Sequence, residues 1–254
     1  MRRIAFSLTL LLATACGGEP DKTKPSASAA AAKPTAPAPA PTPSQTAKPK
    51  APPRECPAGD EITFDEPVLE NSVRAQAKKP TGPITKADLA KVTSLNLTEA
   101  KNNDHLDPCV FPHLTKLKNL FLGRGELDDI KLLANLKELD SLRISITKVK
   151  DLSPLADLKK LDRLDLGRTP VSDLKPLEGL TELTELLLDD TEVTDLSPLA
   201  GLKKLEVLSI KNTRVTDLKP LAGLEALKSL DISGSGVKDT TAVAKLPKLK
   251  IRQE

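Results

Sequence analysis

Residues 180–201 read LTELTELLLDDTEVTDLSPLAG, and residues 202–223 read LKKLEVLSIKNTRVTDLKPLAG. The two segments align without a gap and share the unit L-x-x-L-x-x-L-x-L-x-x-T-x-V-x-D-L-x-P-L-x-x. The first Leu of this unit recurs at positions 114, 136, 158, 180, 202, 224 and 246. A fixed period of about 22 residues is the signature of a repeat architecture, in which similar units stack along one axis.

Each unit must bury its Leu side chains against its neighbours. In the L-x-L segment alternate side chains point to the same side, which is the pattern of a short strand with one buried face. One unit cannot bury that face alone, so successive strands are expected to pair into a parallel sheet as the units stack. The D-L-x-P-L segment suits a tight turn, and its Pro disfavours a long α-helix. We therefore expect 3₁₀ turns or short extended pieces on the side opposite the sheet.

This unit resembles the 22-residue leucine-rich repeat, closest to the internalin-like bacterial type, and the resemblance covers residues 85–251. It implies an α/β solenoid, which is a right-handed superhelix with a parallel sheet on its concave side. The convex side is then expected to be 3₁₀ or irregular, with a short cap helix at the N-terminal end. By analogy with internalin-like proteins, the resemblance also implies that the chain binds another macromolecule rather than catalysing a reaction.

Two polar columns accompany the apolar ones, and both fit structural roles. An Asp stands before each turn, where its carboxylate can accept hydrogen bonds from the backbone amides that follow. A row of carboxylates is also compatible with calcium, but the position before a turn favours capping. A Thr stands where related repeats often have a buried Asn, and its hydroxyl can satisfy backbone groups of the turn. The Asp column is Asp129, Asp151, Asp173, Asp195, Asp217 and Asp239, and the Thr column is Thr147, Thr169, Thr191 and Thr213, with Ser235.

The first sixteen residues have the pattern of a bacterial export signal. Residues 1–3 read MRR, and residues 4–12 are apolar but too few to span a bilayer as a helix. Residues 13–16 read ATAC, which resembles a lipobox, the site at which bacterial lipoproteins are cleaved and acylated on the Cys. This resemblance predicts a signal peptide over residues 1–15 and a lipid-bearing N-terminus at Cys16. The alternative is an ordinary cleaved signal peptide that happens to precede a Cys.

Acylation of Cys16 would hold the protein to a membrane of the bacterial cell envelope. Gly17 follows the Cys where an Asp would favour inner-membrane retention in Gram-negative bacteria. The outer membrane is therefore favoured if the organism has one, with the protein facing the periplasm or the cell surface. Residues 16–54 are rich in Pro and Ala and have no hydrophobic periodicity, so we expect a disordered linker that favours extended polyproline II.

Both ends of the repeat region depart from the unit. Residues 55–91 are expected to form an N-terminal cap, and residues 92–251 the leucine-rich-repeat domain. Thr85 and Asp88 have the spacing of a capping box, which predicts a short helix that leads into the first strand. An insertion near residues 101–113 lengthens the first repeat beyond the period.

Cys56 and Cys109 remain as an even pair once Cys16 is set aside. In an exported protein such a pair favours a disulfide, which here would tie the cap to the first repeat. The alternative is zinc, because His105, Cys109 and His113 are spaced by four residues as on one face of a helix. A Pro lies within each of these intervals and interrupts any such helix, so we expect no metal site.

Charge and composition disfavour several functions. The chain has a net charge of +3, but residues 1–54 hold eight basic and two acidic side chains, which leaves −3 for the rest. A nucleic-acid-binding domain needs a concentrated basic face, so nucleic acid is not expected. Carbohydrate is a poor fit because aromatic residues make up only 2% of the chain. No phosphate-binding loop or metalloprotease motif is present, so we expect neither catalysis nor a cofactor.

A protein partner is expected to bind the outward side of the strands, where side chains stand in rigid rows. Basic residues gather in the early repeats and acidic residues in the later ones, which suits a charge-complementary protein partner of unknown identity. The alternative is a structural scaffold of the envelope or cell wall without a dedicated partner. The predicted contact residues are Phe121, Arg124, Arg143, Arg163, Asp165, Arg168, Glu185, Leu187, Asp189 and Lys211.

Overall fold

The computed structural model describes residues 54–253 except residue 102, and the statements below concern these residues. The predicted signal peptide, Cys16 and the linker up to residue 53 lie outside them. The α-helices are α1 (Pro67–Ala77) and α2 (Lys86–Leu89). The strands are β1 (Glu61–Ile62), β2 (Ile84–Thr85), β3 (Ser94–Leu97), β4 (Asn119–Leu122), β5 (Ser141–Arg143), β6 (Arg163–Asp165), β7 (Glu185–Leu187), β8 (Val207–Ser209), β9 (Ser229–Asp231) and β10 (Lys250–Arg252).

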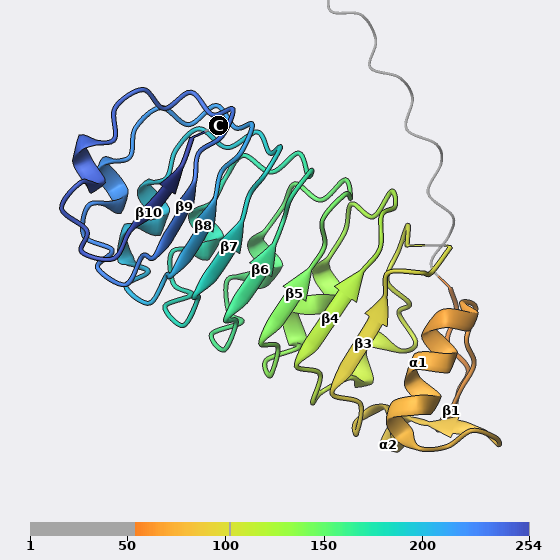
Figure 1. Ribbon diagram of the computed structural model, residues 1–254. Helices are drawn as coiled ribbons and strands as arrows, with labels where there is room; N and C mark the ends of the chain where they lie inside the picture. Colours follow the sequence, from red (N-terminus) through yellow and green to blue (C-terminus); the bar gives the residue numbers. More distant parts are fainter. Residues whose placement is uncertain (1–53, 102, 254) are drawn as a thin grey trace, which may run out of the picture. The chain divides into compact units, whose positions relative to one another are not determined.

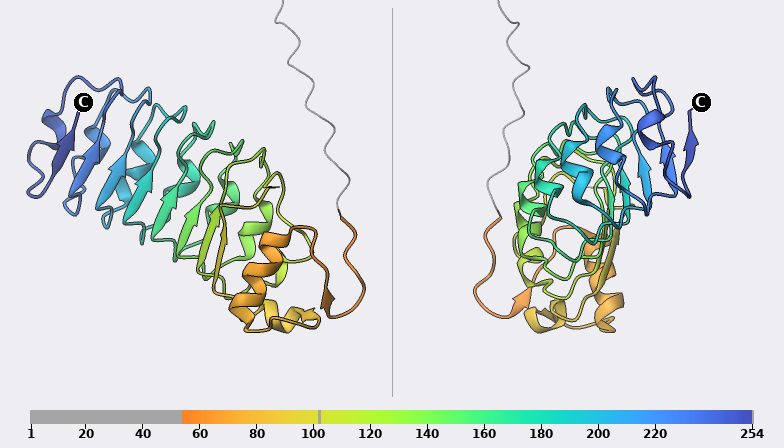
Figure 2. Two further views of the ribbon diagram at one scale, coloured as in Figure 1. Left: turned by 45° about the vertical axis from the view of Figure 1, so that its right-hand side comes forward. Right: turned by 90° about the vertical axis from the view of Figure 1, so that its left-hand side faces the viewer.

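Strands β3 to β10 form one parallel sheet in which each strand pairs with its neighbours in chain order (Figure 1). Short 3₁₀ helices lie on the opposite side of the coil from the sheet (Figures 1 and 2). They are Phe111–His113, Lys131–Asn135, Ser153–Leu155, Lys175–Leu177, Ser197–Gly201, Lys219–Leu221 and Thr241–Val243. This arrangement confirms the solenoid that the 22-residue period predicts, including the 3₁₀ turns at the D-L-x-P-L segments.

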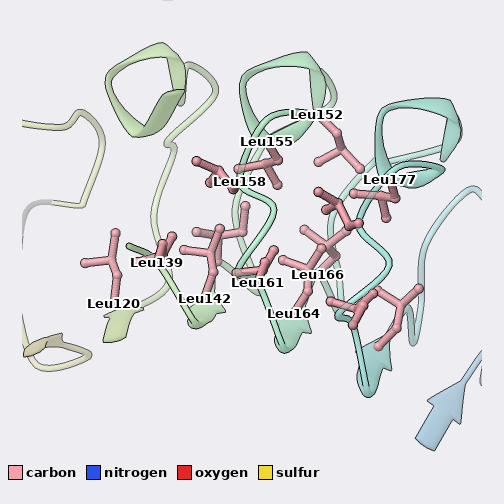
Figure 3. Packing of buried hydrophobic residues seen from close by; sticks show 14 of the residues in the cluster. Leu120, Leu139, Leu142, Leu152, Leu155, Leu158, Leu161, Leu164, Leu166 and Leu177 are labelled. Carbon is pink, nitrogen blue, oxygen red and sulfur yellow. The ribbon is translucent and has the colours of Figure 1, made fainter. Parts of the chain in front are cut away.

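The core runs along the inside of the coil and consists mostly of Leu. The middle strand residues stack in register, so that Leu164 of β6 faces Leu142 of β5 and Leu186 of β7. These side chains are no more than 1% exposed, and Leu from the 3₁₀ side meets them from across the coil (Figure 3). Burial of each such side chain contributes roughly 1.5–3 kcal/mol before the loss of conformational entropy is counted. Because the Leu side chains of each repeat are buried by the adjacent repeats, the stability of every repeat depends on its neighbours.

The Asp column caps the 3₁₀ turns, as predicted. The carboxylate of Asp173 accepts a hydrogen bond from the backbone N–H of Lys175 at 2.8 Å, and Asp195 and Asp217 accept in the same way two residues on. The four Thr of the Thr column are buried and also satisfy the backbone. The Thr191 hydroxyl, for example, donates to the Leu188 carbonyl at 2.7 Å. Both columns therefore belong to the fold.

A further column has a positive φ, which the sequence analysis did not predict. Residues with φ between 53° and 67° occur every 22 positions, just after the strands: Ile146, Arg168, Asp190, Asn212 and Gly234. We call these five residues the left-handed column. Four of them donate a backbone hydrogen bond to the next repeat, as Ile146 N–H does to the Gly167 carbonyl at 2.8 Å. The column thus turns the chain out of each strand and joins successive repeats.

The N-terminal cap covers the first strand of the sheet. Helix α1 begins after Glu66, whose side chain accepts from the Val68 N–H, and it buries Leu69 and Val73. It packs against β3, where the Ser72 hydroxyl donates to the Asn96 carbonyl at 3.3 Å. The sequence predicts one short cap helix. The structure has that helix, α2 with its Thr85–Asp88 capping box, and the longer α1 in addition.

A disulfide and an ion-pair cluster fasten the start of the cap to the insertion. Cys56 and Cys109 are bonded in the structure, with Cα atoms 5.3 Å apart. The Arg54 guanidinium lies 2.5 Å from the Asp107 carboxylate and 3.1 Å from that of Asp65. Arg54 was assigned to the linker from the sequence. Its charge pairing makes it part of the folded cap instead.

The insertion is held by close backbone approach. Asn103 is buried and donates to the carbonyls of Leu97 and Ala100. A Cβ at Gly123 would lie 2.5 Å from the Thr98 carbonyl oxygen, and one at Gly125 would lie 2.9 Å from the carbonyl oxygen of Asn103. The two glycines therefore allow the insertion to pack directly on the second repeat. Within residues 54–253, neither α-helix is both long and apolar enough to cross a bilayer.

The Asp caps predict a loss of stability in acid. The pKa values of Asp151 and Asp195 are lowered from the usual 3.8 by hydrogen bonds from the hydroxyl and N–H of the Ser two residues later. A folded pKa below the unfolded value gives stability that is complete above the unfolded pKa and lost as the pH falls through the folded pKa. The melting temperature, followed by circular dichroism, should therefore drop as the pH falls below about 4.

The matched variant is Asp195→Asn, which keeps the shape of the cap but does not ionise. It should be less stable than the wild type at pH 7, and the difference in melting temperature should shrink toward pH 2. A difference that stays constant with pH would show that the ionised carboxylate does not contribute.

Candidate partner-binding surface

The outward side chains of β3 to β10, which we call the sheet face, carry six of the ten predicted contact residues. Strand register places Phe121, Arg143, Asp165 and Leu187 side by side in one row. Arg163 and Glu185 stand next to each other in the neighbouring row. The other four lie just beyond the strand ends: Arg124, Arg168, Asp189 and Lys211. The structure thus brings the six strand residues to one face of the sheet.

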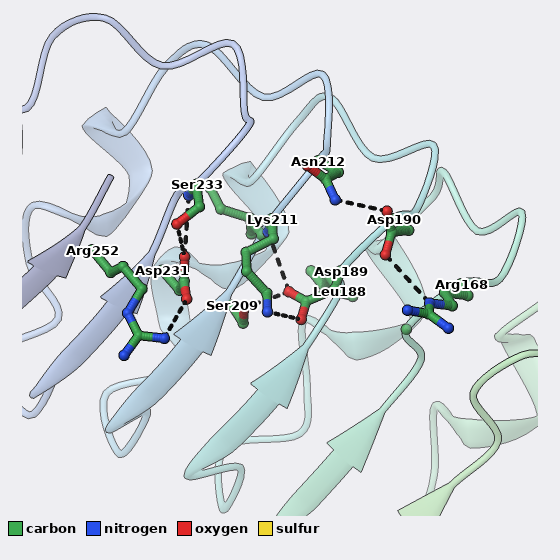
Figure 4. Close-up of polar contacts among 12 residues, drawn as sticks. Arg168, Leu188, Asp189, Asp190, Ser209, Lys211, Asn212, Asp231, Ser233 and Arg252 are labelled. Carbon is green, nitrogen blue, oxygen red and sulfur yellow. Dashed lines mark hydrogen bonds and ion pairs between the residues drawn. The ribbon is translucent and has the colours of Figure 1, made fainter. Parts of the chain in front are cut away.

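Several of these charges are paired with one another. The Arg143 guanidinium lies 3.2 Å from the Asp165 carboxylate. The Arg168 guanidinium lies 3.5 Å from the Asp190 carboxylate (Figure 4). Lys211 lies 3.3 Å from Asp189, whose carboxylate also accepts from the Ser209 hydroxyl. The sequence suggested a basic region followed by an acidic one. Pairing between adjacent repeats neutralises part of that difference.

Ile146, in the left-handed column, was missed by the sequence analysis. It is 41% exposed, and among the described residues it is the one large apolar residue that is exposed. It also has a φ of 60°, a conformation that a β-branched side chain adopts only with strain. The other members of the column are Arg, Asp, Asn and Gly, so Ile stands out. The signal was present in the sequence, since Asn212 and Gly234 mark the column as one that tolerates a positive φ.

The residues considered for zinc do not converge. Cys109 is bonded to Cys56, and the described residues contain no group of three His, Cys, Asp or Glu side chains arranged to hold a metal ion. His105 lines a cavity of about 40 Å³ together with Asp107 and Phe111. That volume holds a few water molecules and is far below the roughly 300 Å³ of a typical small-molecule site.

Comparison with known proteins agrees with this architecture. A family model described as Leucine Rich repeats (2 copies) matches residues 181–223. A search of curated proteins finds no significant match. Among solved structures, internalin C2 from Listeria monocytogenes has 28% sequence identity and a TM-score of 0.68, over 79% of this chain and 100% of that one.

Another similar structure is an internalin (inlF) from Listeria monocytogenes, with 29% identity and a TM-score of 0.66 over 74% of this chain. This chain spans 56% of that protein's length. The ectodomain of the Arabidopsis thaliana receptor kinase GASSHO1/SCHENGEN3, in complex with Casparian strip integrity factor 2, shares the fold at 22% identity and a TM-score of 0.51, over 57% of this chain and 19% of that one. The chain thus contains leucine-rich repeats, folds as a leucine-rich-repeat solenoid, and is structurally similar to Listeria internalins.

Proposed function

We propose that the chain is a protein-binding module of a bacterial cell envelope or surface, with the sheet face as its binding surface. The observation that carries this proposal is a contrast between the two sides of the strands. Inward positions repeat Leu, whereas the outward row changes chemical type at every strand, from Phe121 through Arg143 and Asp165 to Leu187. The core requires the inward pattern, but the fold imposes no such sequence on the outward row. Selection by a partner accounts for that variety.

Ile146 supports the same surface. A β-branched residue with positive φ costs roughly 1–2 kcal/mol relative to a residue that accepts this conformation. Burial offsets this cost only in part, since 41% of the residue's surface remains exposed and available to a partner. Strain of this kind is typical of functional positions. We infer that Ile146 contacts the partner beside the sheet face and gains its burial there.

The membrane anchor rests on the sequence alone. The lipobox-like residues 13–16 support acylation at Cys16, and the Pro-rich residues 16–53 support a spacer between the membrane and the folded domain. The resemblance to internalins supports a bacterial surface or envelope location. A Cys16→Ala variant should leave the membrane fraction for the soluble fraction, and continued sedimentation with membranes would contradict the anchor. Proteolysis of intact cells then decides between a surface and a periplasmic location.

The binding surface can be tested by site-specific photo-crosslinking in cells. A crosslinking amino acid at Leu187, on the sheet face, should give a discrete adduct, whereas one at Lys175, on the 3₁₀ side, should not. The double reversal Arg143→Glu/Arg163→Glu should weaken the Leu187 adduct by roughly tenfold through lost charge complementarity. The matched control, Lys175→Glu/Lys219→Glu, makes the same change in net charge on the opposite side and should have no effect.

Ile146→Asn separates binding from folding. Asn accepts a positive φ, so this variant should gain about 1 kcal/mol in free energy of unfolding while it loses crosslinking. Loss of binding by a more stable protein cannot be attributed to misfolding. If Leu187 gives no discrete adduct, the chain is a structural scaffold without a dedicated partner on this surface. An adduct that neither the charge reversals nor Ile146→Asn changes would contradict the contacts proposed for these residues.

A further inference from the structure

The first and last strands of the parallel sheet differ in how they are covered. At the first end, α1 packs on β3 and buries Leu69 and Val73. At the other end, β10 is the last strand of the sheet, and no described residue pairs with its outer edge. The contrast leaves one end of the solenoid open within residues 54–253.

The open edge presents backbone groups in a defined direction. The Lys250 N–H donates to the Lys228 carbonyl at 2.9 Å, and the Arg252 carbonyl accepts from the Ile232 N–H at 2.9 Å. Both bonds join β10 to β9. Because the N–H and C=O of successive strand residues point to alternate sides, those of Ile251 point away from β9. Ile251 therefore offers one donor and one acceptor to an added strand.

Apolar side chains at this end are incompletely covered. Val237, Leu249 and Ile251 pack against the core but are only partly buried. Their counterparts one repeat earlier are completely buried, because the following repeat lies on them: Val215, Leu227 and Leu230. An occupant of the β10 edge would bury the same kind of surface.

Two lysines at this end lack the partners that interior repeats have, whereas Arg252 lies 3.7 Å from the Asp231 carboxylate. Lys160 lies 2.6 Å from Glu138, and Lys204 lies 2.6 Å from Glu182, in each case across 22 residues. The next Lys in this column is Lys248, and the residue 22 positions before it is Ala226. Neither Lys248 nor Lys250 forms an ion pair within the part of the chain that the structure describes.

The surplus of positive charge extends over the whole last repeat. Residues 237–253 contain five basic side chains and one acidic side chain, and all five basic residues are exposed. The rest of the described domain is acidic by comparison, so the basic character is confined to this end. Pairing with β10 of a second copy would place Lys250 and Arg252 next to the same basic residues of that copy, and like charges repel.

We propose that the outer edge of β10 is a docking site for an extended acidic segment of a partner protein, which adds to the sheet as a further strand. Its backbone bonds to the Ile251 N–H and C=O, as in other cases of strand addition. Its carboxylates pair with Lys248 and Lys250, and its alternate apolar residues cover Leu249 and Ile251. This site is separate from the sheet face and does not depend on the function proposed there.

The test uses the full chain, labelled with ¹⁵N, and two synthetic peptides of about eight residues, a usual strand length. One peptide alternates Val with Glu, and the other alternates Val with Lys. At low salt the Glu peptide should slow hydrogen exchange of the Ile251 amide by about tenfold or more, and the Lys peptide should not. The variant Lys248→Glu/Lys250→Glu should show the reverse preference, with slower exchange of the Ile251 amide in the presence of the Lys peptide and not of the Glu peptide.

Lys148→Glu/Lys150→Glu is the matched control, because these two exposed residues have the same spacing and no ion pair among the described residues. It should retain the preference of the wild type. The proposal is overturned if the Glu peptide leaves the Ile251 amide unaffected or shifts the amides of the sheet face instead. It is also overturned if the chain without peptide is a dimer in sedimentation and its Ile251 amide is already protected from exchange. That result would assign the edge to a second copy.

Discussion

Replacement of Leu186 by Ala should lower the free energy of unfolding by about 3–5 kcal/mol. Leu186 lies in the middle of β7, is completely buried, and faces Leu164 and Leu208 in the adjacent strands. Truncation removes the transfer energy of the side chain and leaves a cavity that the flanking repeats cannot fill, because their own strands fix the spacing. The measurement is urea unfolding followed by circular dichroism.

The neighbouring residue provides a control of identical chemistry. Leu187 belongs to the same strand but points to the sheet face and is only half-buried. Leu187→Ala should cost less than about 1 kcal/mol, since little buried surface is lost. Equal costs at the two positions would contradict the strand register on which the fold and the sheet face both depend.

Removal of the disulfide should have the second large effect. Cys56 and Cys109 are 53 residues apart in sequence, and closure of a loop of that length is worth about 4 kcal/mol in the chain-entropy model. The double variant Cys56→Ser/Cys109→Ser should therefore unfold at clearly lower denaturant concentration than the wild type. Hydrogen exchange should accelerate most in α1 and the insertion, where the bridge restrains the chain.

Both proteins in this comparison carry Cys16→Ser, so that Cys56 and Cys109 are the only cysteines of the reference protein, whether or not Cys16 is normally acylated. After denaturation without reductant, the reference protein should contain no free thiol. Two free thiols per chain, or equal stability of the reference and the double variant, would show that the cysteines are not bonded in solution.

Much of the fold could be predicted because the same pattern of buried Leu residues recurs in successive repeats. The period of Leu gave the strands and their parallel order, and the positions of Asp195 and Thr191 before and within turns gave their capping roles. Helix α1 occurs once and has no repeated counterpart, so its two buried residues, Leu69 and Val73, did not form a recognisable pattern. The left-handed column is marked in the sequence only by Asn212 and Gly234, because backbone dihedrals impose a weak preference on side chains, and Ile146 violates even that preference.

The candidate surface was predictable in outline only. Strand alternation is enough to place Phe121, Arg143 and Leu187 on the outer side of the sheet. It does not indicate which charges will neutralise each other, because an ion pair such as Arg143–Asp165 depends on register and rotamers across two repeats. The open edge of β10 depends on how the last repeat ends in three dimensions. That information is distributed over Ile251 and its neighbours and is absent from the repeat pattern.

The position of the disulfide has a mechanical consequence. Tension applied through the chain that precedes Cys56 passes across the covalent bridge directly to Cys109, next to the first stacked repeats. The residues between the two cysteines, which include α1 and β3, form a closed loop outside that line of force. A pull from the N-terminal side therefore loads the stacked repeats and leaves the helix that covers β3 in place, so the first end of the sheet stays covered under load.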